Sequence, residues 1–539
     1  MNIQGASKVA TRAGNELAAI GDLQANAQQS TPALRLLPEI LAIIFSFHAE
    51  ANPPEENGIV PRGMTIAQFR LGWITVTHVC PIWRQVALDH RTLWTYHRFN
   101  LGLEWTAELL RRAGDAPLNL TFSDYIVPFP PSVANAAKII SQLLHRVNTL
   151  NIGEAACTSA VLDALMQPGP LMNSLTITSG RFAVLPQFLF AGYAPLHHLS
   201  LRNALPAWNA VVLTRLKSLN IAMDRHTDTT NHPSYVDLFN ALQTMSNLET
   251  LMLIGCLPLG RFPDHLEGQK IRIPKLRRLL LSGHVQGFRQ MLEHLDFPHE
   301  TVVRGSCITD DMTGKECCDV VPLLLSYLPR PSLETLDVSW GDRFDRHFNI
   351  RGYSTSQEDN KSGKPYFSLE ATPCFNIEFQ FKFLLWSAEQ KLRILKTVYG
   401  ALPTDELRVL SGKLDLGKDA WPEIFGRHQE LRHIRICSLS TLDSLVPVFN
   451  RPDVYPNLVS LTVCDMDLHS KQGSRIFLII NILKTCRPPR MSKIFIESCE
   501  IRRELVGWME SAIREVEIEW DGVEFPNARR ARSLTNSAV

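Results

Sequence analysis

The hydrophobic pattern near the start of the chain is that of a helix that is apolar on nearly every side. The segment covers residues 37–47 and reads LPEILAIIFSF. Pro38 suits the first turn of a helix, where its missing N–H costs nothing, and Glu39 puts a negative charge at the positive end of the helix dipole. At 3.6 residues per turn the apolar side chains form two stripes, so we expect the helix to be covered on two faces. The stripes are Leu37, Leu41, Ile44 and Ile40, Ile43, Phe47.

A second helical pattern follows a polar loop at residues 48–63. Val79, Trp83 and Val86 recur at helical spacing, and Pro81 marks the start of a new helix. The region therefore predicts a compact bundle of short helices. A bundle this small cannot bury both faces of its first helix, so one face is expected to contact another polypeptide. The alternative is that the same residues form the core of an ordinary helical domain.

The two segments together resemble the F-box, whose pattern runs roughly L-P-x-E-[IL]-[IL]-x-x-I-F and then V-C-x-x-W-R. The resemblance covers residues 34–122, and the form with an insert, here at 48–70, is similar to the F-box-like proteins abundant in mushroom-forming fungi. The insert is a departure from the family pattern. The matching positions are Leu37, Pro38, Glu39, Ile40, Leu41, Ile44, Phe45, Val79, Cys80, Trp83 and Arg84.

The resemblance implies that this region docks on a Skp-type adaptor, which joins a cullin and a RING subunit in an SCF ubiquitin ligase. Burying the apolar side chains of the first helix would contribute roughly 8–15 kcal/mol. Association costs roughly 4–15 kcal/mol, so the cluster around Val79 and Trp83 is expected to contribute as well. The implied adaptor-binding residues are Leu37, Pro38, Ile40, Leu41, Ile44, Phe45, Val79, Cys80 and Trp83.

After residue 145 the hydrophobic pattern changes to a short element of the form L-x-x-L-x-L. The first steps average about 26 residues, a period typical of leucine-rich repeats. The elements begin at residues 196, 216, 248, 276, 333, 431 and 458, with shorter versions at 150, 175 and 494. The alternative is a set of ordinary α/β crossovers in a doubly wound sheet.

The expected fold class is therefore a small α-helical bundle followed by an irregular α/β leucine-rich-repeat solenoid. The solenoid is expected over 145–520, between a flexible or helical segment at 1–33 and a tail at 521–539. Polar segments at 299–320 and 341–366 are expected to interrupt it as surface loops. The Asn or Cys that the repeat pattern places after each strand is met only by Cys256 and Cys499.

Alternation along the expected strands separates core residues from surface residues. The Leu-type residues of L-x-L point into the core, and the positions between them face the other side at a period of two. Stacked in parallel, these outward positions would form one surface of mixed character that could bind a target protein. Its candidate residues are His198, Ser200, Arg202, Asn220, Met252, Asp337, Arg435 and Phe495.

Composition adds limits to this picture. The chain has 539 residues with 55 Lys+Arg and 54 Asp+Glu, so its formal net charge is +1. No global basic field exists to attract nucleic acid or anionic lipid, and neither is expected as a partner. Neither a secretory signal nor a run of about 20 apolar residues is found. The eleven cysteines form no CxxC pair and are expected to be reduced, mostly buried thiols, which fits the cytoplasm or nucleus.

The motifs of common catalytic sites are missing. Neither a phosphate-binding loop nor G-x-G-x-x-G, G-x-S-x-G or H-E-x-x-H occurs, so we expect no catalytic residue, metal or cofactor. The function expected is that of a substrate-recognition subunit of a ubiquitin ligase. One alternative is an adaptor-bound scaffold without ligase function. Another is an unrecognised enzyme, which a pocket holding paired titratable groups at hydrogen-bond distance would indicate.

Overall fold

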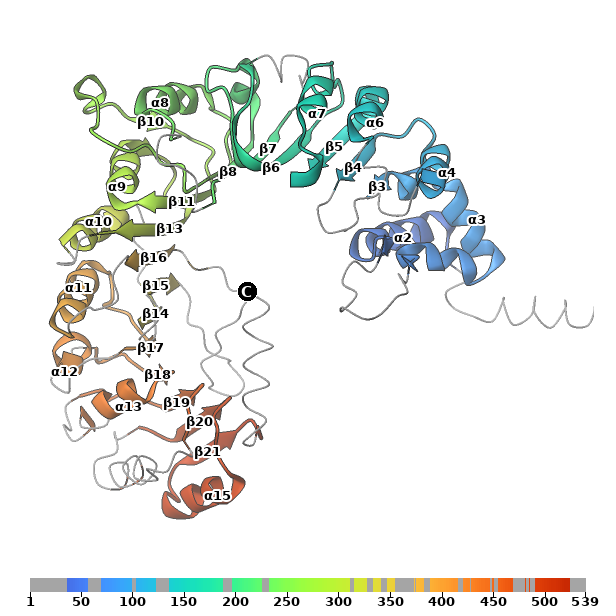
Figure 1. Ribbon diagram of the computed structural model, residues 1–539. Helices are drawn as coiled ribbons and strands as arrows, with labels where there is room; N and C mark the ends of the chain where they lie inside the picture. The colour runs from blue at the N-terminus through green and yellow to red at the C-terminus, as the bar shows by residue number, and fades with distance from the viewer. Residues whose placement is uncertain are drawn as a thin grey trace, which may run out of the picture. The chain divides into compact units, whose positions relative to one another are not determined.

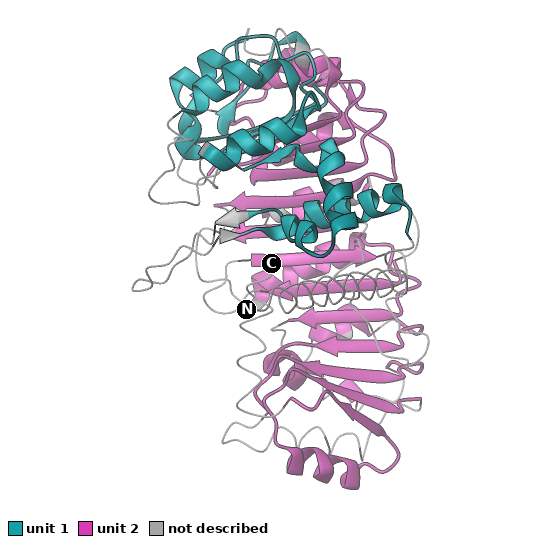
Figure 2. Ribbon diagram, turned by 90° about the vertical axis from the view of Figure 1, so that its right-hand side faces the viewer, with its two compact units in different colours: residues 1–212 teal, residues 213–539 magenta. Residues whose placement is uncertain are grey.

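The structure is a computed structural model in which the chain forms two compact units, residues 1–212 and 213–539 (Figure 2). The residues described are 36–56, 69–98, 103–122, 135–187, 196–224, 232–310, 315–326, 333–340, 347–353, 373, 375–381, 388–414, 420–426, 428–445, 448–449, 454–468, 480, 484 and 490–523.

Short helices come first in unit 1 (Figure 1). One begins at Pro38 and another at Pro81, as the sequence predicts. The ring of Trp73 packs edge-on against that of Trp94, with 4.8 Å between the ring centroids. The elements are α2 (Pro38–Ala51), η2 (Gly72–His78), α3 (Pro81–Asp89), η3 (Arg91–Trp94) and α4 (Leu103–Ala113). Within the expected insert, β1 (Glu55–Glu56) pairs antiparallel with β2 (Phe69–Arg70).

A parallel sheet follows directly in unit 1, and its strands pair in chain order. These strands are β3 (Tyr96–His97), β4 (Leu118–Phe122), β5 (Val147–Ile152), β6 (Ser174–Val184) and β7 (His198–Leu205). Helical segments occupy the connections: α6 (Ala136–Leu143), η4 (Leu144–Arg146), η5 (Glu154–Ala156) and α7 (Ser159–Ala164). Because β3 starts immediately after η3, the N-terminal helices share one compact unit with this sheet.

Unit 2 holds a longer sheet that is parallel except for one strand. Its first strands pair in chain order: β8 (Ser218–Ala222), β9 (Thr250–Ile254), β11 (Arg278–His284) and β13 (Val302–Thr309). Its last strands do the same: β17 (Val409–Lys413), β18 (His433–Ile436), β19 (Ser460–Cys464), β20 (Lys493–Glu497) and β21 (Glu517–Trp520). A smaller parallel pair joins β10 (Ile271–Arg272) to β12 (Leu295–Asp296).

The strand order reverses in the middle of this sheet. The intervening strands are β14 (Thr335–Trp340), β15 (His347–Tyr353) and β16 (Phe375–Phe381). Strand β13 pairs with β16 rather than with β14, and β17 pairs with β14. Strand β15 lies between β14 and β16 and is antiparallel to both. The chain therefore skips two positions in the sheet after β13 and fills them on the way back.

Helices of unit 2 lie along one side of these strands (Figure 1). Successive helices α9, α10, α11 and α12 pack on one another. The helices are α8 (Tyr235–Thr244), η9 (Asp264–Leu266), α9 (Val285–His294), α10 (Lys315–Ser326), α11 (Ala388–Ala401), α12 (Ala420–Phe425), α13 (Leu439–Leu445) and α15 (Arg503–Ala512). The short helix η7 (Val211–Arg215) begins in unit 1 and ends in unit 2. Among the described residues, no helix has the length and apolar composition needed to cross a bilayer.

Every L-x-L element singled out in the sequence forms a strand, namely β5 to β9, β11, β14 and β18 to β20. Their inward positions form the core; Leu219, Leu251 and Leu281, for example, are fully buried. Strands β3, β4, β13, β16, β17 and β21 are not among the strands predicted from the repeated element.

Two expected interruptions are wrong in part. The segment 299–320 contains the complete strand β13 and much of α10, so it forms a regular strand and helix. The segment 341–366 contains β15, and the rest of it lies outside the described residues. Polar side chains misled the prediction, because in β13 they alternate with the buried Val303 and Cys307.

The cysteines depart from the expectation of reduced thiols in one pair, because Cys437 and Cys464 form a disulfide. Other cysteines follow the repeat pattern. The thiols of Cys256 and Cys499 donate to the carbonyl oxygens of Ile221 and Val463, each on the preceding strand, over 3.8 and 3.4 Å. These contacts tie neighbouring repeats together at the ends of their strands.

Candidate protein-binding surfaces

Helix α2 has one face in the core of unit 1. Its buried residues are Leu41, Ala42, Phe45 and Ala49. They lie against η2, α3 and η3, and the ring of Phe45 meets that of Trp83 edge-on at 5.2 Å. This inward face fixes the orientation of α2 in the bundle.

The opposite face of α2 is a continuous apolar stripe exposed to solvent. Leu37 is 66% exposed and Phe47 69%. At about 100° per residue, the exposed apolar positions fall within an arc roughly 120° wide, opposite the buried Ala42 and Phe45. We call this set the α2 stripe: Leu37, Ile40, Ile43, Ile44 and Phe47.

The prediction is therefore wrong for two of the residues implied to bind the adaptor. Leu41 and Phe45 are each only 1% exposed, so they stabilise the bundle and do not present a surface to a partner. Leu37, Pro38, Ile40 and Ile44 are exposed. The sequence shows that α2 is apolar all round, but only packing against α3 and η2 decides which face is covered.

Ile43 and Phe47 extend the exposed surface and are missing from the implied set. Both are in the second stripe of the sequence pattern, opposite the residues that become the core. The sequence signal for both was a large apolar side chain on the side of the helix that faces away from the core.

The second matching segment has a structural role and an exposed part. Cys80 caps α3, because its sulfur accepts a hydrogen bond from the Trp83 backbone N–H over 3.5 Å. Arg84 Nε donates to the carbonyl oxygen of Thr77 over 2.8 Å, which holds the preceding turn. Val79 is 60% exposed, and its apolar neighbour Ile82 is also exposed. The segment thus combines a capping cysteine and a half-buried tryptophan with solvent-exposed apolar side chains.

The candidate target-binding residues occupy outward positions of their strands, but their exposure differs. In unit 1, His198 and Arg202 on β7 are exposed and Ser200 is half-buried. In unit 2, Asn220, Met252, Asp337 and Arg435 are half-buried.

The prediction that Phe495 lies at the target-binding surface is wrong. It is 1% exposed, as are its neighbours Ile494 and Ile496, so β20 is buried on both faces. Ser411 on β17 and Thr462 on β19 are buried in the same way. The period of two predicts which way a side chain points, but it does not predict what covers that face.

Charged residues form a network on the strands of unit 2. Arg351 lies 4.0 Å from Asp337, and Arg435 lies 3.7 Å from Glu497. Burial raises the pKa of Asp337 above its usual range, although a hydrogen bond from Ser411 and the charges of Arg351 and Arg435 act in the opposite direction. The structure therefore brings Asp337 and Arg435, two of the candidate residues, into one electrostatic environment.

A polar pocket of about 670 Å³ lies beside α11 and α12. Within it the hydroxyl of Tyr399 hydrogen-bonds to His428 Nε2, and Lys396 pairs with Glu423 over 2.6 Å. These are paired titratable groups of the kind that would indicate an enzyme.

Burial shifts the pKa values of both Tyr399 and His428 in this pocket. Burial raises the pKa of Tyr399, so its phenol does not ionise near neutral pH. Burial also lowers the pKa of His428, despite the opposing charge of Asp405.

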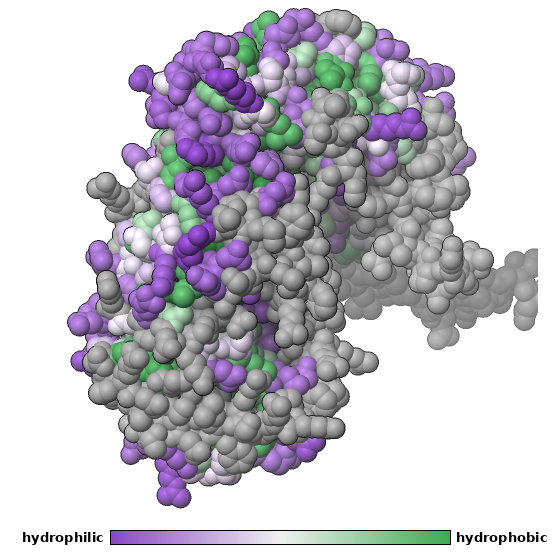
Figure 3. All heavy atoms as spheres, turned by 60° about the vertical axis from the view of Figure 1, so that its left-hand side comes forward, coloured by the Kyte–Doolittle hydropathy of each residue, from purple (hydrophilic) through white to green (hydrophobic). Residues whose placement is uncertain are grey.

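In the view of Figure 3, the hydrophobic side chains among the coloured residues gather in groups between hydrophilic ones. In the α2 stripe, the exposed apolar side chains follow one face of a single helix from turn to turn.

Comparisons with known proteins do not assign the chain to a family. No family model matches it, and no curated protein matches it. One similar solved structure is a chain of the Rad7 and Elc1 complex in yeast, which is 12% identical over 92% of this chain and 93% of that chain, with a TM-score of 0.24. Another is a leucine-rich-repeat protein of Leptospira interrogans, 11% identical over 75% of this chain and 88% of that chain, with a TM-score of 0.21. At such TM-scores neither similarity establishes a shared fold or function.

Proposed function

We propose that this chain is a substrate-recognition subunit of an SCF-type ubiquitin ligase. In this proposal the N-terminal helices are an F-box that docks on a Skp-type adaptor, and through it on a cullin and a RING subunit. The repeated strands bind a target protein. The observation that carries the proposal is the α2 stripe, which is exposed on a helix whose other face is fully packed.

An exposed stripe of this kind is costly for a chain in water. Each large aliphatic or aromatic side chain gains about 1.5–3 kcal/mol when it is fully buried. Contiguous apolar patches on folded proteins usually mark interaction sites. The stripe and the exposed Val79 and Ile82 together supply apolar surface that a partner protein would cover.

The residues that match the F-box pattern divide into two roles under this proposal. Leu41, Phe45, Cys80 and Trp83 hold the helices together through burial, ring contact and capping. Leu37, Ile40 and Ile44 face outward and would contact the adaptor. A pattern with both roles explains the combination of Pro, Cys and Trp with an all-round apolar helix.

We also propose that the repeated strands are irregular leucine-rich repeats. Strands pair in chain order on both sides of the β14–β16 reversal, and the helices of unit 2 lie on one side of the sheet (Figure 1). A doubly wound sheet would carry helices on both faces. The contacts of Cys256 and Cys499 with the preceding strand repeat the same interaction at two distant places in unit 2.

The target surface in this proposal is the outward side of the strands, where Asp337, Arg435 and Glu497 offer charges of both signs. No reactive group of this chain is needed. Holding a target lysine near an activated ubiquitin raises its effective concentration, and the chemistry resides in other subunits. Such a role belongs to the cytoplasm or nucleus.

The docking step is tested by placing a charge on the α2 stripe. Ile44→Asp and Phe47→Asp, made separately in the full chain, should weaken binding to a purified Skp-type adaptor by about 10- to 100-fold each, because each removes apolar burial worth about 1.5–3 kcal/mol. Val184→Asp is the matched control, since Val184 is 63% exposed in the same unit but lies on strand β6. Dissociation constants from calorimetry are the measurement.

Equal affinities for all variants, or no binding by the unmodified chain at micromolar concentration, would contradict the proposal. Adding the cullin separates the ligase role from a scaffold role. A ligase subunit should assemble into a complex with adaptor and cullin together, whereas a scaffold should hold the adaptor and exclude the cullin.

A further inference from the structure

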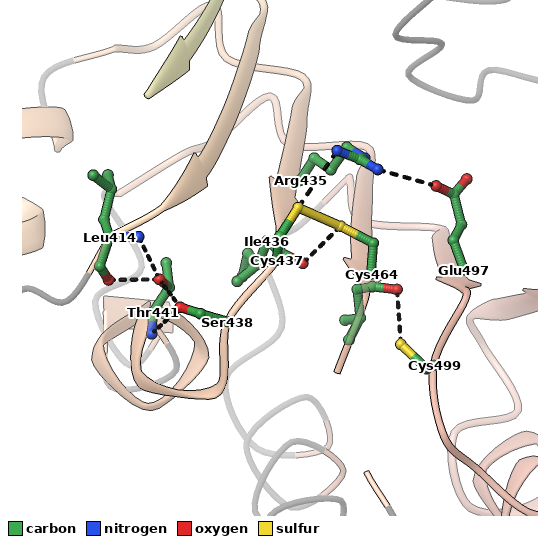
Figure 4. The surroundings of a disulfide bond; sticks show 10 residues. Leu414, Arg435, Ile436, Cys437, Ser438, Thr441, Cys464, Glu497 and Cys499 are labelled. Carbon is green, nitrogen blue, oxygen red and sulfur yellow. Dashed lines mark hydrogen bonds and ion pairs between the residues drawn. A yellow bond between two sulfur atoms is a disulfide. The ribbon is translucent and has the colours of Figure 1, made fainter. Parts of the chain in front are cut away.

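Two cysteines lie side by side where strands β18 and β19 end (Figure 4). The register pairs Ile436 with Val463, so Cys437 and Cys464 are the next neighbours along the two strands. Their Cα atoms are 4.8 Å apart, which is both the normal spacing of strands and within the range that a disulfide spans. The disulfide therefore joins strands that backbone hydrogen bonds already align.

The same backbone also suits the reduced pair. Cys464 Sγ lies 3.1 Å from the carbonyl oxygen of Ile436, and Cys499 Sγ has the same relation to Val463 one strand further along. A disulfide sulfur has no proton to donate, so the contact with Ile436 becomes a hydrogen bond only in the dithiol. Either redox state thus satisfies the buried Cys464 without a change in strand pairing.

The two sulfurs differ in access and in charge. Cys464 is buried, whereas Cys437 is half-buried. Arg435 Nη1 lies 3.4 Å from Cys437 Sγ (Figure 4). A guanidinium beside a sulfur stabilises its thiolate, which is both the attacking and the leaving form in disulfide exchange. Cys437 is the sulfur that a soluble thiol or disulfide would reach first.

We propose that Cys437 and Cys464 form a reversible dithiol–disulfide couple that exchanges with small thiols and disulfides of the glutathione class. In oxidation, the Cys437 thiolate attacks one sulfur of the small disulfide, forms a mixed disulfide and releases one thiolate. Cys464 then gives its proton to water, and its sulfur attacks Cys437 Sγ and releases the second thiolate. The chain loses two electrons and two protons, and the oxidant becomes two thiols. The couple does not require the proposed ligase function, although Arg435 belongs to both proposed sites.

A metal ion is the competing use of these side chains. Cys437, Cys464 and Asp465 each place one ligand atom within 4.8 Å of the others. A divalent cation at this position would stand close to the Arg435 guanidinium, which already lies 3.4 Å from Cys437 Sγ. Like charges repel, so the surroundings favour exchange chemistry over metal binding.

The test equilibrates the full-length chain in buffers that span reduced to oxidised glutathione, traps thiols by acid and alkylation, and measures each cysteine peptide by mass spectrometry. Cys437 and Cys464 should lose alkylation together with one midpoint and appear as a linked peptide, and dithiothreitol should reverse this. Cys499 is the internal control, because it is a buried thiol two residues after β20 whose sulfur also contacts a carbonyl oxygen of the preceding strand. It should stay alkylated throughout.

Two variants sharpen the result. Cys437→Ala should leave Cys464 a thiol in every buffer, and Arg435→Gln should slow disulfide formation roughly threefold by reducing the thiolate fraction. The wild-type titration decides the question even where a variant does not fold.

The proposal is overturned if the two cysteines stay reduced or only bind glutathione singly, or if the bond resists excess dithiothreitol in the folded chain. Stoichiometric zinc that protects both thiols, with no disulfide at any glutathione ratio, would assign a metal site instead.

Discussion

His97 shows how one residue couples the core of unit 1 to pH. It lies on β3 directly after the N-terminal helices and is 2% exposed. Burial lowers its pKa from 6.5 to about 4, the charge of Arg146 acts in the same direction, and a hydrogen bond with the Trp94 backbone opposes both. The folded chain therefore holds His97 neutral where an unfolded chain would protonate it.

This shift in the pKa of His97 predicts how the stability of the folded chain depends on pH. Between pH 6.5 and about 4 the unfolded state binds a proton that the folded state does not, so the stability from neutral His97 is present above pH 6.5 and is lost as the pH falls to about 4. In His97→Asn, the difference in unfolding free energy between pH 7 and pH 4.5 should shrink by about 2 kcal/mol. Urea unfolding at the two pH values is the measurement. The same substitution at the exposed His78 is the control and should leave the wild-type pH dependence in place.

At the scale of elements, the junction of α2 with η2 decides how the bundle presents the α2 stripe. Gly72 begins η2 with a φ of +53°, a conformation that costs other residues about 1–2 kcal/mol. A Cβ there would lie 2.5 Å from the Pro53 carbonyl oxygen. The next residue, Trp73, donates its N–H to the Asn52 carbonyl oxygen over 2.7 Å, so this close approach ties the end of α2 to η2.

Gly72→Ala is therefore expected to destabilise unit 1 by at least about 2 kcal/mol, from the left-handed conformation and the steric overlap together. Adaptor binding should weaken at the same time, because the orientation of α2 depends on this contact. Gly507→Ala in α15 is the matched control. A Cβ at Gly507 meets no atom within 4 Å, so the helix should gain about 0.5–1 kcal/mol. Urea unfolding of both variants compares them, and equal stabilities would refute the role of Gly72.

The strands of unit 2 also show which features the sequence pattern predicts and which it does not. The L-x-L spacing locates β8, β9 and β11 correctly, because each needs two inward aliphatic residues to cover the core. The same pattern locates β14 but not its neighbours in the sheet. Pairing of β13 with β16 joins residues far apart in the chain, and no local period records such a choice.

At the scale of the whole molecule, the proposed function assigns binding to two separate sets of residues. The α2 stripe belongs to unit 1, and the charged network of Asp337, Arg435 and Glu497 belongs to unit 2. Apolar burial would provide the affinity for the adaptor, whereas charge complementarity would provide selectivity for a target.

Arg435→Glu tests this separation. The new carboxylate would repel Glu497, which now lies 3.7 Å from Arg435, and would reverse the charge offered to a target. We expect adaptor affinity to change less than twofold while the recovery of target proteins falls, measured by quantitative mass spectrometry of complexes purified from cells with the proteasome inhibited. Ile44→Asp should give the reverse pattern. Loss of both partners in either variant would show that the two functions are not separable.

The sequence by itself determined the elements: a helix apolar on both faces, a break at Pro81, and strands wherever L-x-L recurs. These features depend on local periodicity, backbone restriction and the need of each element to bury aliphatic side chains. Only the tertiary structure decided that Leu41 and Phe45 are core while Ile43 and Phe47 are exposed, that Phe495 is covered, and that Cys437 meets Cys464. Those outcomes depend on which surfaces pack together and on strand register, and both are set by contacts between residues distant in the chain.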